Sequence, residues 1–155
     1  MAAAARGTTM AEYELHVEVE RRTVHVRMTG MFSEAEMRTW IKLFRTKSTN
    51  FFRGRKHMII ADMRGMKTVS LPVAQLMADE IGHARLNGVV LCAHVSDDTV
   101  QRLQAARVAR QKSPHDDVTV DVSSPEEAHR VISEGWHRLD DPRYTGSIRD
   151  AVRNI

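Results

Sequence analysis

The stretch His57–Ser70, HMIIADMRGMKTVS, decides the fold of this chain. It opens with an apolar run, 58–61, whose length and lack of alternation suit a strand covered on both faces. Asp62 follows, then a loop that contains Gly65. In open α/β sheets, binding and catalysis concentrate in the loops at the carboxyl ends of such strands. We therefore expect a central strand over 57–62 and a functional region directly after it.

The segment after this stretch has clear signals for a helix over 71–86. Ser70 is a suitable N-cap, and Pro72 stands in the first turn. Apolar residues recur at helical spacing, and Asn87-Gly88 ends the segment with residues that tolerate a left-handed backbone. A second continuous apolar run predicts a buried strand over 89–95, and Ser96-Asp97-Asp98 then predicts the start of a helix over 98–111.

The segments before the central strand predict a hairpin and one helix. Apolar and polar residues alternate over 13–19 and again over 23–28, with a short polar turn between them, which is typical of a β-hairpin. Ser33 and Glu36 form a capping-box pattern, and the following apolar spacing predicts a helix over 34–46, with a loop at 48–50.

The last segments predict a short strand, a helix and a tail. Alternation over 118–122 predicts a half-polar strand at the sheet edge, and Ser124-Pro125 starts a helix over 125–134. The tail helix over 148–155 is amphipathic and too short to be stable alone, so either its own domain or a second copy of the chain must cover it. We divide the chain into a disordered leader (1–11), one domain (12–138) and this tail (139–155).

The element order predicts an α/β fold: a single-domain mixed β-sheet in which an N-terminal hairpin is followed by β-α-β-α-β-α, with right-handed crossovers. The composition fits one globular domain, since the 155 residues are 42% hydrophobic and 28% charged. A formal charge of +3 is too small to indicate nucleic-acid binding. The aromatic and basic residues of 51–56 can contact bases, or the two Phe residues can anchor the preceding helix to the core.

The sequence also bears on the cellular compartment of the protein, on metal and cofactor binding, and on catalysis. The single cysteine, Cys92, predicts a reducing, cytoplasmic environment, and no segment is long and apolar enough to span a membrane. The eight histidines show no metal-ligand spacing, and no Gly-rich loop matches a phosphate or dinucleotide fingerprint, so we expect no metal and no cofactor. Alternation places Cys92 and His94 on one face of their strand, where Cys92 serves as a small buried hydrophobic residue or, less commonly, forms a reactive couple with His94. The sequence shows no combination of a nucleophile, a base and an orienting group, so we expect that the protein is not an enzyme.

The order of elements and the sequence around Asp62 resemble those of the SpoIIAA-like branch of the STAS domains. This branch includes anti-sigma-factor antagonists and relatives that are grouped with Sec14-like lipid binders. The hairpin comes first, an Asp follows the central strand, and Ser70 lies at the start of the next helix. The similarity covers about 13–134. In antagonists a partner kinase phosphorylates the Ser of an Asp-Ser-[Ser/Thr]-Gly turn, and the matching stretch here reads Val69-Ser70-Leu71-Pro72.

The resemblance implies a non-catalytic regulatory module that binds a protein partner, such as an anti-sigma-factor-like kinase. It implies a contact patch in the loop after the central strand and at the start of the next helix, with Ser70 as the phosphorylation candidate: Asp62, Arg64, Lys67, Thr68 and Ser70. From the residues alone, Asp62 equally caps the loop and Ser70 equally caps the helix.

The Sec14-like relatives imply an alternative, the binding of a small apolar or lipid ligand. Four methionines fall around the proposed centre and suit an adaptable apolar pocket: Met58, Met63, Met66 and Met77. The two readings differ in an observable way. A partner-binding module should have a filled core and an exposed polar loop, whereas a ligand binder should have an apolar cavity beside the helix over 71–86.

Overall fold

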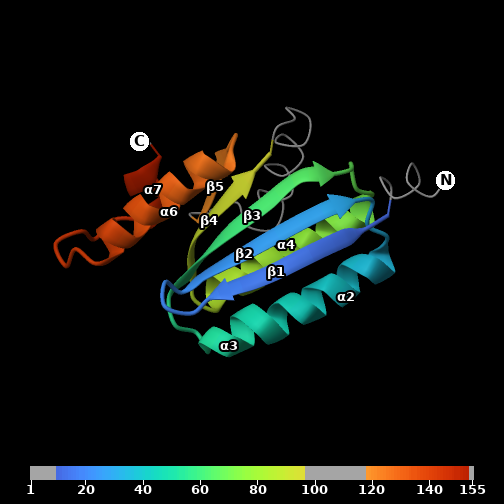
Figure 1. Ribbon diagram of the computed structural model, residues 1–155. Coiled ribbons are helices and arrows are strands. Elements are labelled where there is room, and N and C mark those ends of the chain that lie inside the picture. The colour runs from blue at the N-terminus through green and yellow to red at the C-terminus, as the bar shows by residue number, and fades with distance from the viewer. Residues whose placement is uncertain (1–9, 97–117, 154–155) are drawn as a thin grey trace.

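A computed structural model of the protein describes residues 10–96 and 118–153. One five-stranded sheet runs through it in the order β1-β2-β3-β4-β5 (Figure 1). The strands are β1 (Glu12–Glu18), β2 (Thr23–Gly30), β3 (His57–Met66), β4 (Val89–Val95) and β5 (Thr119–Val122).

Strand pairing confirms the predicted mixed sheet. β1 and β2 form an antiparallel hairpin in which Leu15 pairs with Val26. The pairs β2–β3, β3–β4 and β4–β5 are parallel, and β5 lies at the edge, as its half-polar alternation predicts. The helix predicted over 98–111 lies outside the described residues.

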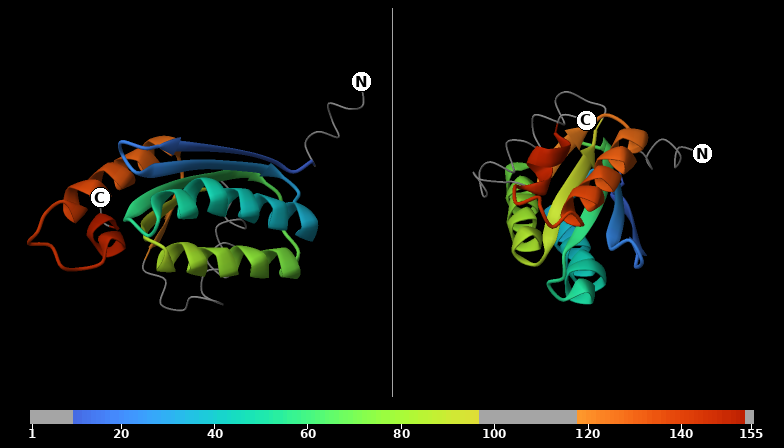
Figure 2. Two further views of the ribbon diagram at one scale, coloured as in Figure 1. Left: turned by 90° about the horizontal axis from the view of Figure 1, so that it is seen from below. Right: turned by 90° about the vertical axis from the view of Figure 1, so that its left-hand side faces the viewer.

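Helices cover both faces of the sheet (Figure 2). α2 (Glu34–Phe44) and α4 (Leu71–Leu86) pack on one face, and α6 (Pro125–Leu139) and α7 (Ile148–Val152) pack on the other. Two parallel crossovers that leave successive neighbouring strands with the same hand place their helices on the same face, which explains why α2 and α4 lie side by side.

The structure confirms the predicted bounds of α4. The Ser70 hydroxyl accepts a hydrogen bond from the Val73 amide at 3.4 Å, and Pro72 stands in the first turn. The Asn87 amide donates to the Ala84 carbonyl, and Gly88 follows with a φ of +109°. The cap at each end therefore satisfies backbone groups that the helix itself leaves unpaired.

The central strand is longer than predicted. β3 does not end at Asp62 but continues to Met66, because β2 continues beside it and pairs Thr29 with Gly65 and Gly30 with Met66. The register shifts between Arg27 and Thr29, so β3 carries one extra residue, as in a β-bulge. The predicted strand end at Asp62 is therefore wrong for the pairing with β2, although the pairing with β4 stops there, at Asp62–Val95.

The chain around 45–52 is helical, so the predicted loop at 48–50 is wrong. A π-helical turn, η2 (Arg45–Thr49), follows α2 directly and leads into the short helix α3 (Asn50–Phe52). Ser48 and Phe52 are fully buried on this turn, whereas Phe51 is exposed. Burial of these side chains holds the segment against the sheet, and one of the two predicted Phe anchors is present.

The sheet separates two hydrophobic cores. Ile59, Ala61 and Met63 of β3 face α2 and α4, whereas Met58 and Ile60 face α6 and α7. β3 is therefore covered on both faces, as its continuous apolar run predicts. The tail helix α7 buries Ile148 and Val152 in the second core, so the chain covers its own tail.

His57, the first residue of β3, is a buried histidine whose protonation affects stability. Its ring is fully buried and stacked on Phe52, and Nδ1 lies 2.8 Å from the Arg55 carbonyl. Nε2 has no hydrogen-bond partner in the described part of the chain. Burial lowers the pKa of His57, so the folded protein favours the neutral ring. The unfolded chain binds the proton first, so stability should fall as the pH drops below about 6.5. His57→Phe should show a shallower loss in urea unfolding between pH 7.5 and 5, and parallel curves would contradict the assignment.

Candidate functional site

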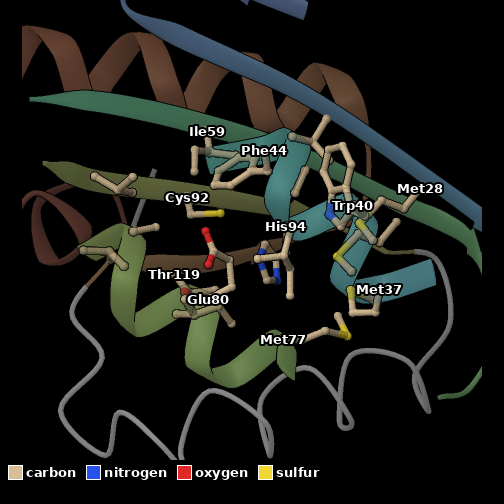
Figure 3. A pocket seen from close by; sticks show the side chains of 18 residues that line it. Met28, Met37, Trp40, Phe44, Ile59, Met77, Glu80, Cys92, His94 and Thr119 are labelled. Atoms are coloured by element: carbon tan, nitrogen blue, oxygen red, sulfur yellow. The ribbon is translucent and has the colours of Figure 1, made fainter. Parts of the chain in front are cut away.

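An apolar pocket of about 100 Å³ lies between the sheet and the helices α2 and α4 (Figure 3). Its walls are mostly carbon and sulfur: Met28, Met37, Met63, Met77, Trp40, Phe44, Ile59 and Cys92 are among the lining residues. The polar side chains in the wall are Glu80, His94 and Thr119. A concave apolar site with few polar groups is the usual form of a small-molecule site.

The predicted methionine cluster is only partly correct. Met63 and Met77 line the pocket and Met66 is buried in the same core, but Met58 lies on the opposite face of the sheet. Strand alternation explains this, because residues 58 and 63 differ by an odd number of positions. Met28 and Met37, which come from β2 and α2, complete the sulfur-rich wall instead.

Glu80 is a polar side chain of the pocket wall that the sequence analysis missed. It belongs to α4, is only 9% exposed, and its Oε1 accepts a hydrogen bond from Nε of Arg45 at 2.8 Å. A signal for it exists, because Val73, Met77, Glu80 and Ala84 follow the i, i+4, i+7, i+11 spacing of one helix face. A carboxylate on an otherwise apolar stripe indicates a buried acid.

Burial raises the pKa of the Glu80 carboxyl, and the hydrogen bond and positive charge of Arg45 offset only part of this effect. An acid whose pKa is raised on folding stabilises the native state below its ordinary pKa and loses that contribution as the pH rises through the raised value. Wild-type protein should therefore gain stability relative to Glu80→Gln as the pH falls from 7 towards about 4.5. Urea unfolding of both proteins across this range measures the difference, and a gap that stays constant would contradict the burial effect.

Cys92 and His94 lie on the same face of β4, as alternation predicts, and both form part of the pocket wall. Both side chains are buried, and Cys92 packs in the core shared with α2 and α4. In the structure, both side chains therefore belong to the buried wall of the pocket. The reactive couple stays a prediction.

Asp62 and Arg64, the first two residues of the predicted contact patch, form an ion pair. The Arg64 side chain donates to both carboxylate oxygens of Asp62 at 2.9 and 2.8 Å, and the Arg64 amide donates to Oδ1 at 3.2 Å. Partial burial alone raises the pKa of Asp62, but the hydrogen bonds and charge of Arg64 outweigh it, so the pKa lies below its usual value. Asp62 thus orders the bulged end of β3, as its capping alternative predicts.

The other three residues of the patch follow on the connection from β3 to α4. Lys67, Thr68 and Ser70 are exposed, and the Lys67 amide donates to the Gly30 carbonyl at 2.9 Å. Ser70 is the N-cap of α4, so the capping alternative for this residue is confirmed. The residue is nevertheless exposed.

In the ranges 10–96 and 118–153, no three side chains of His, Cys, Asp or Glu come together in a way that could hold a metal ion. Of the helices within them, none combines the length and the apolar character that crossing a membrane requires.

Comparison with known proteins identifies the fold. No protein-family model matches the chain, and no curated protein matches its sequence. Among solved structures, it is similar to an uncharacterized protein of the DUF3478 family with a SpoIIAA-like fold from Shewanella loihica PV-4. The TM-score is 0.60 at 13% sequence identity, and the match covers 80% of this chain and 96% of the other. The predicted SpoIIAA-like fold is therefore confirmed.

Proposed function

From this SpoIIAA-like fold, we propose that the protein is a non-catalytic binding module whose pocket takes a small apolar ligand. The pocket between the sheet, α2 and α4 is the observation that supports the proposal. It lies beside α4, where the ligand-binding alternative places a cavity. Its volume of about 100 Å³ is somewhat below the roughly 150 Å³ of an apolar cavity that accepts benzene. The pocket therefore suits a single ring or a short alkyl chain.

The experiment uses protein labelled with ¹³C at the methionine methyl groups and titrated with toluene. The methyl signals of Met28, Met37, Met63 and Met77 should shift and saturate, because these side chains line the pocket. Met58 is the internal control, since it is fully buried on the other face of the sheet. The absence of saturable shifts, or shifts confined to the exposed Met10 and Met31, would contradict the proposal.

A regulatory interaction through the β3–α4 connection is the second candidate function. Its support is the exposed residue Ser70 at the N-terminus of a sixteen-residue helix, next to Leu71, which is 67% exposed. A phosphate there gains from the free amides and the dipole of the helix. The resemblance to anti-sigma-factor antagonists suggests that the partner is a kinase of that type.

Mass spectrometry of the protein purified from its own host tests this second candidate. We expect the mass of one phosphate that survives denaturation and maps to Ser70 or Thr68. Ser124 is the matched control, because its hydroxyl caps α6 in the same way, accepting from the Glu127 amide at 3.1 Å. Unmodified protein, or phosphate on Ser124 in place of Ser70, would argue against a switch at the start of α4.

A further inference from the structure

We infer that the ligand of the pocket carries one neutral hydrogen-bond donor, as a phenol or an alcohol does, and that this donor pairs with Oε2 of Glu80. This inference rests on the proposed function, because it specifies the chemistry of the same pocket. It adds that the pocket rejects ligands whose polar group is an anion.

The two carboxylate oxygens of Glu80 have different surroundings. Oε1 accepts a hydrogen bond from Nε of Arg45. Oε2 is buried and has no hydrogen-bond partner among the described residues. Figure 3 shows this carboxylate pointing from α4 towards the side of the sheet that carries Cys92 and His94. One oxygen therefore holds α4 to the end of α2, and the other is available to a molecule in the pocket.

An acceptor that is buried and unpaired is costly for the folded protein. It has lost its hydrogen bonds to water, and none of the described residues, the polar wall residues His94 and Thr119 included, replaces them at Oε2. The surrounding carbon and sulfur also lower the local dielectric, which strengthens any hydrogen bond formed there. A ligand that supplies an O–H donor removes this cost, whereas a purely apolar ligand leaves it in place.

The charge of the site decides against acidic ligands. A bound carboxylate or phosphate would place a second negative charge beside Glu80, which is unfavourable at short range in a poorly solvated site. Arg45, the cation that pairs with Glu80, already donates its Nε to Oε1 of Glu80. A neutral hydroxyl on an apolar ring or chain fits both the free acceptor and the apolar wall.

Phenol and toluene provide the test, because they are similar in size and differ in one hydroxyl group. In a purely apolar pocket toluene binds better, since the hydroxyl of phenol must leave water. We expect the ratio of dissociation constants, toluene over phenol, to fall at least about tenfold when Glu80→Leu removes the acceptor. Titration of the labelled methionine methyls gives both constants, and benzoate serves as the anionic probe.

Two further variants keep the result clear. Glu134→Leu is the matched control, because Glu134 also pairs with an arginine, Arg138, but on α6. It should leave the ratio unchanged. If Glu80→Leu does not fold, Glu80→Met provides a second apolar replacement of similar length.

The outcomes separate this inference from the proposed function. A ratio that falls in the Glu80 variant alone supports the hydroxyl donor. Toluene binding with the same ratio in wild type and variant overturns the inference and leaves the pocket as a ligand site. Tighter binding of benzoate than of phenol also overturns it. If neither toluene nor phenol shifts the pocket methionines, the proposed function fails, and this inference fails with it.

Discussion

Replacing Gly88 by alanine should lower the free energy of unfolding by roughly 3 kcal/mol, the sum of backbone strain and steric crowding. Gly88 has a φ of +109°, which side-chain-bearing residues rarely adopt. A Cβ at this position would lie 2.4 Å from the Arg55 carbonyl oxygen and 2.7 Å from that of Gly54. Because these are backbone atoms, no side-chain rotation relieves the contact, and the turn from α4 into β4 must open.

Two other glycines allow the contributions of backbone strain and steric crowding at Gly88 to be measured separately. Gly54 also has a positive φ, +79°, but a Cβ there meets no described atom within 4 Å, so Gly54→Ala should cost only the backbone strain of about 1–2 kcal/mol. Gly82 lies within α4, where a Cβ likewise meets no described neighbour, and Gly82→Ala should stabilise the protein by about 0.5–1 kcal/mol. Urea unfolding with a constant m-value measures all three. Equal losses at positions 54 and 88 would show that the contacts of Gly88 carry no energy.

The sequence predicts an element well where its determinants are local. The bounds of α4 follow from Ser70, Pro72 and Asn87-Gly88, which lie within or next to the helix. The end of β3 is set instead by β2, which pairs Thr29 and Gly30 with Gly65 and Met66 more than thirty positions away. Asp62 and Gly65 are poor strand residues by themselves, so local signals end the strand too early. The same limit explains η2, whose buried Ser48 is held by tertiary packing rather than by propensity.

The same distinction between local and long-range determinants applies to the candidate site. The exposed patch around Ser70 is contiguous in sequence and can be found from it. The pocket is assembled from β2, α2, β3, α4, β4 and β5, so no single stretch contains it. One of its polar side chains, Glu80, has a visible signal in the spacing of α4, but its partner Arg45 lies 35 residues earlier on another element. Pairing of these two residues becomes visible only once α2 and α4 are known to share a face.

Filling the pocket should abolish toluene binding without unfolding the protein. Ala84 is buried on α4 and lines the pocket. In Ala84→Leu the new side chain occupies the space that the ligand needs, so the methyl groups of Met28, Met37 and Met77 should no longer show saturable shifts. Because the added carbons fill existing space, we expect the free energy of unfolding to stay within about 1 kcal/mol of wild type or to rise.

Ala78→Leu is the matched control for this substitution. Ala78 lies on the same helix and is 1% exposed, but unlike Ala84 it does not line the pocket. It packs against Ala74 and against Met77 and Ile81, whose side chains also reach the pocket wall. The same change there should cost about 1–3 kcal/mol through overpacking. A stability difference between the two leucine variants measures usable space beside α4, and the toluene titration shows whether a ligand uses it. If Ala84→Leu costs as much as Ala78→Leu, the core beside α4 is filled, and the interaction module centred on Ser70 becomes the stronger proposal.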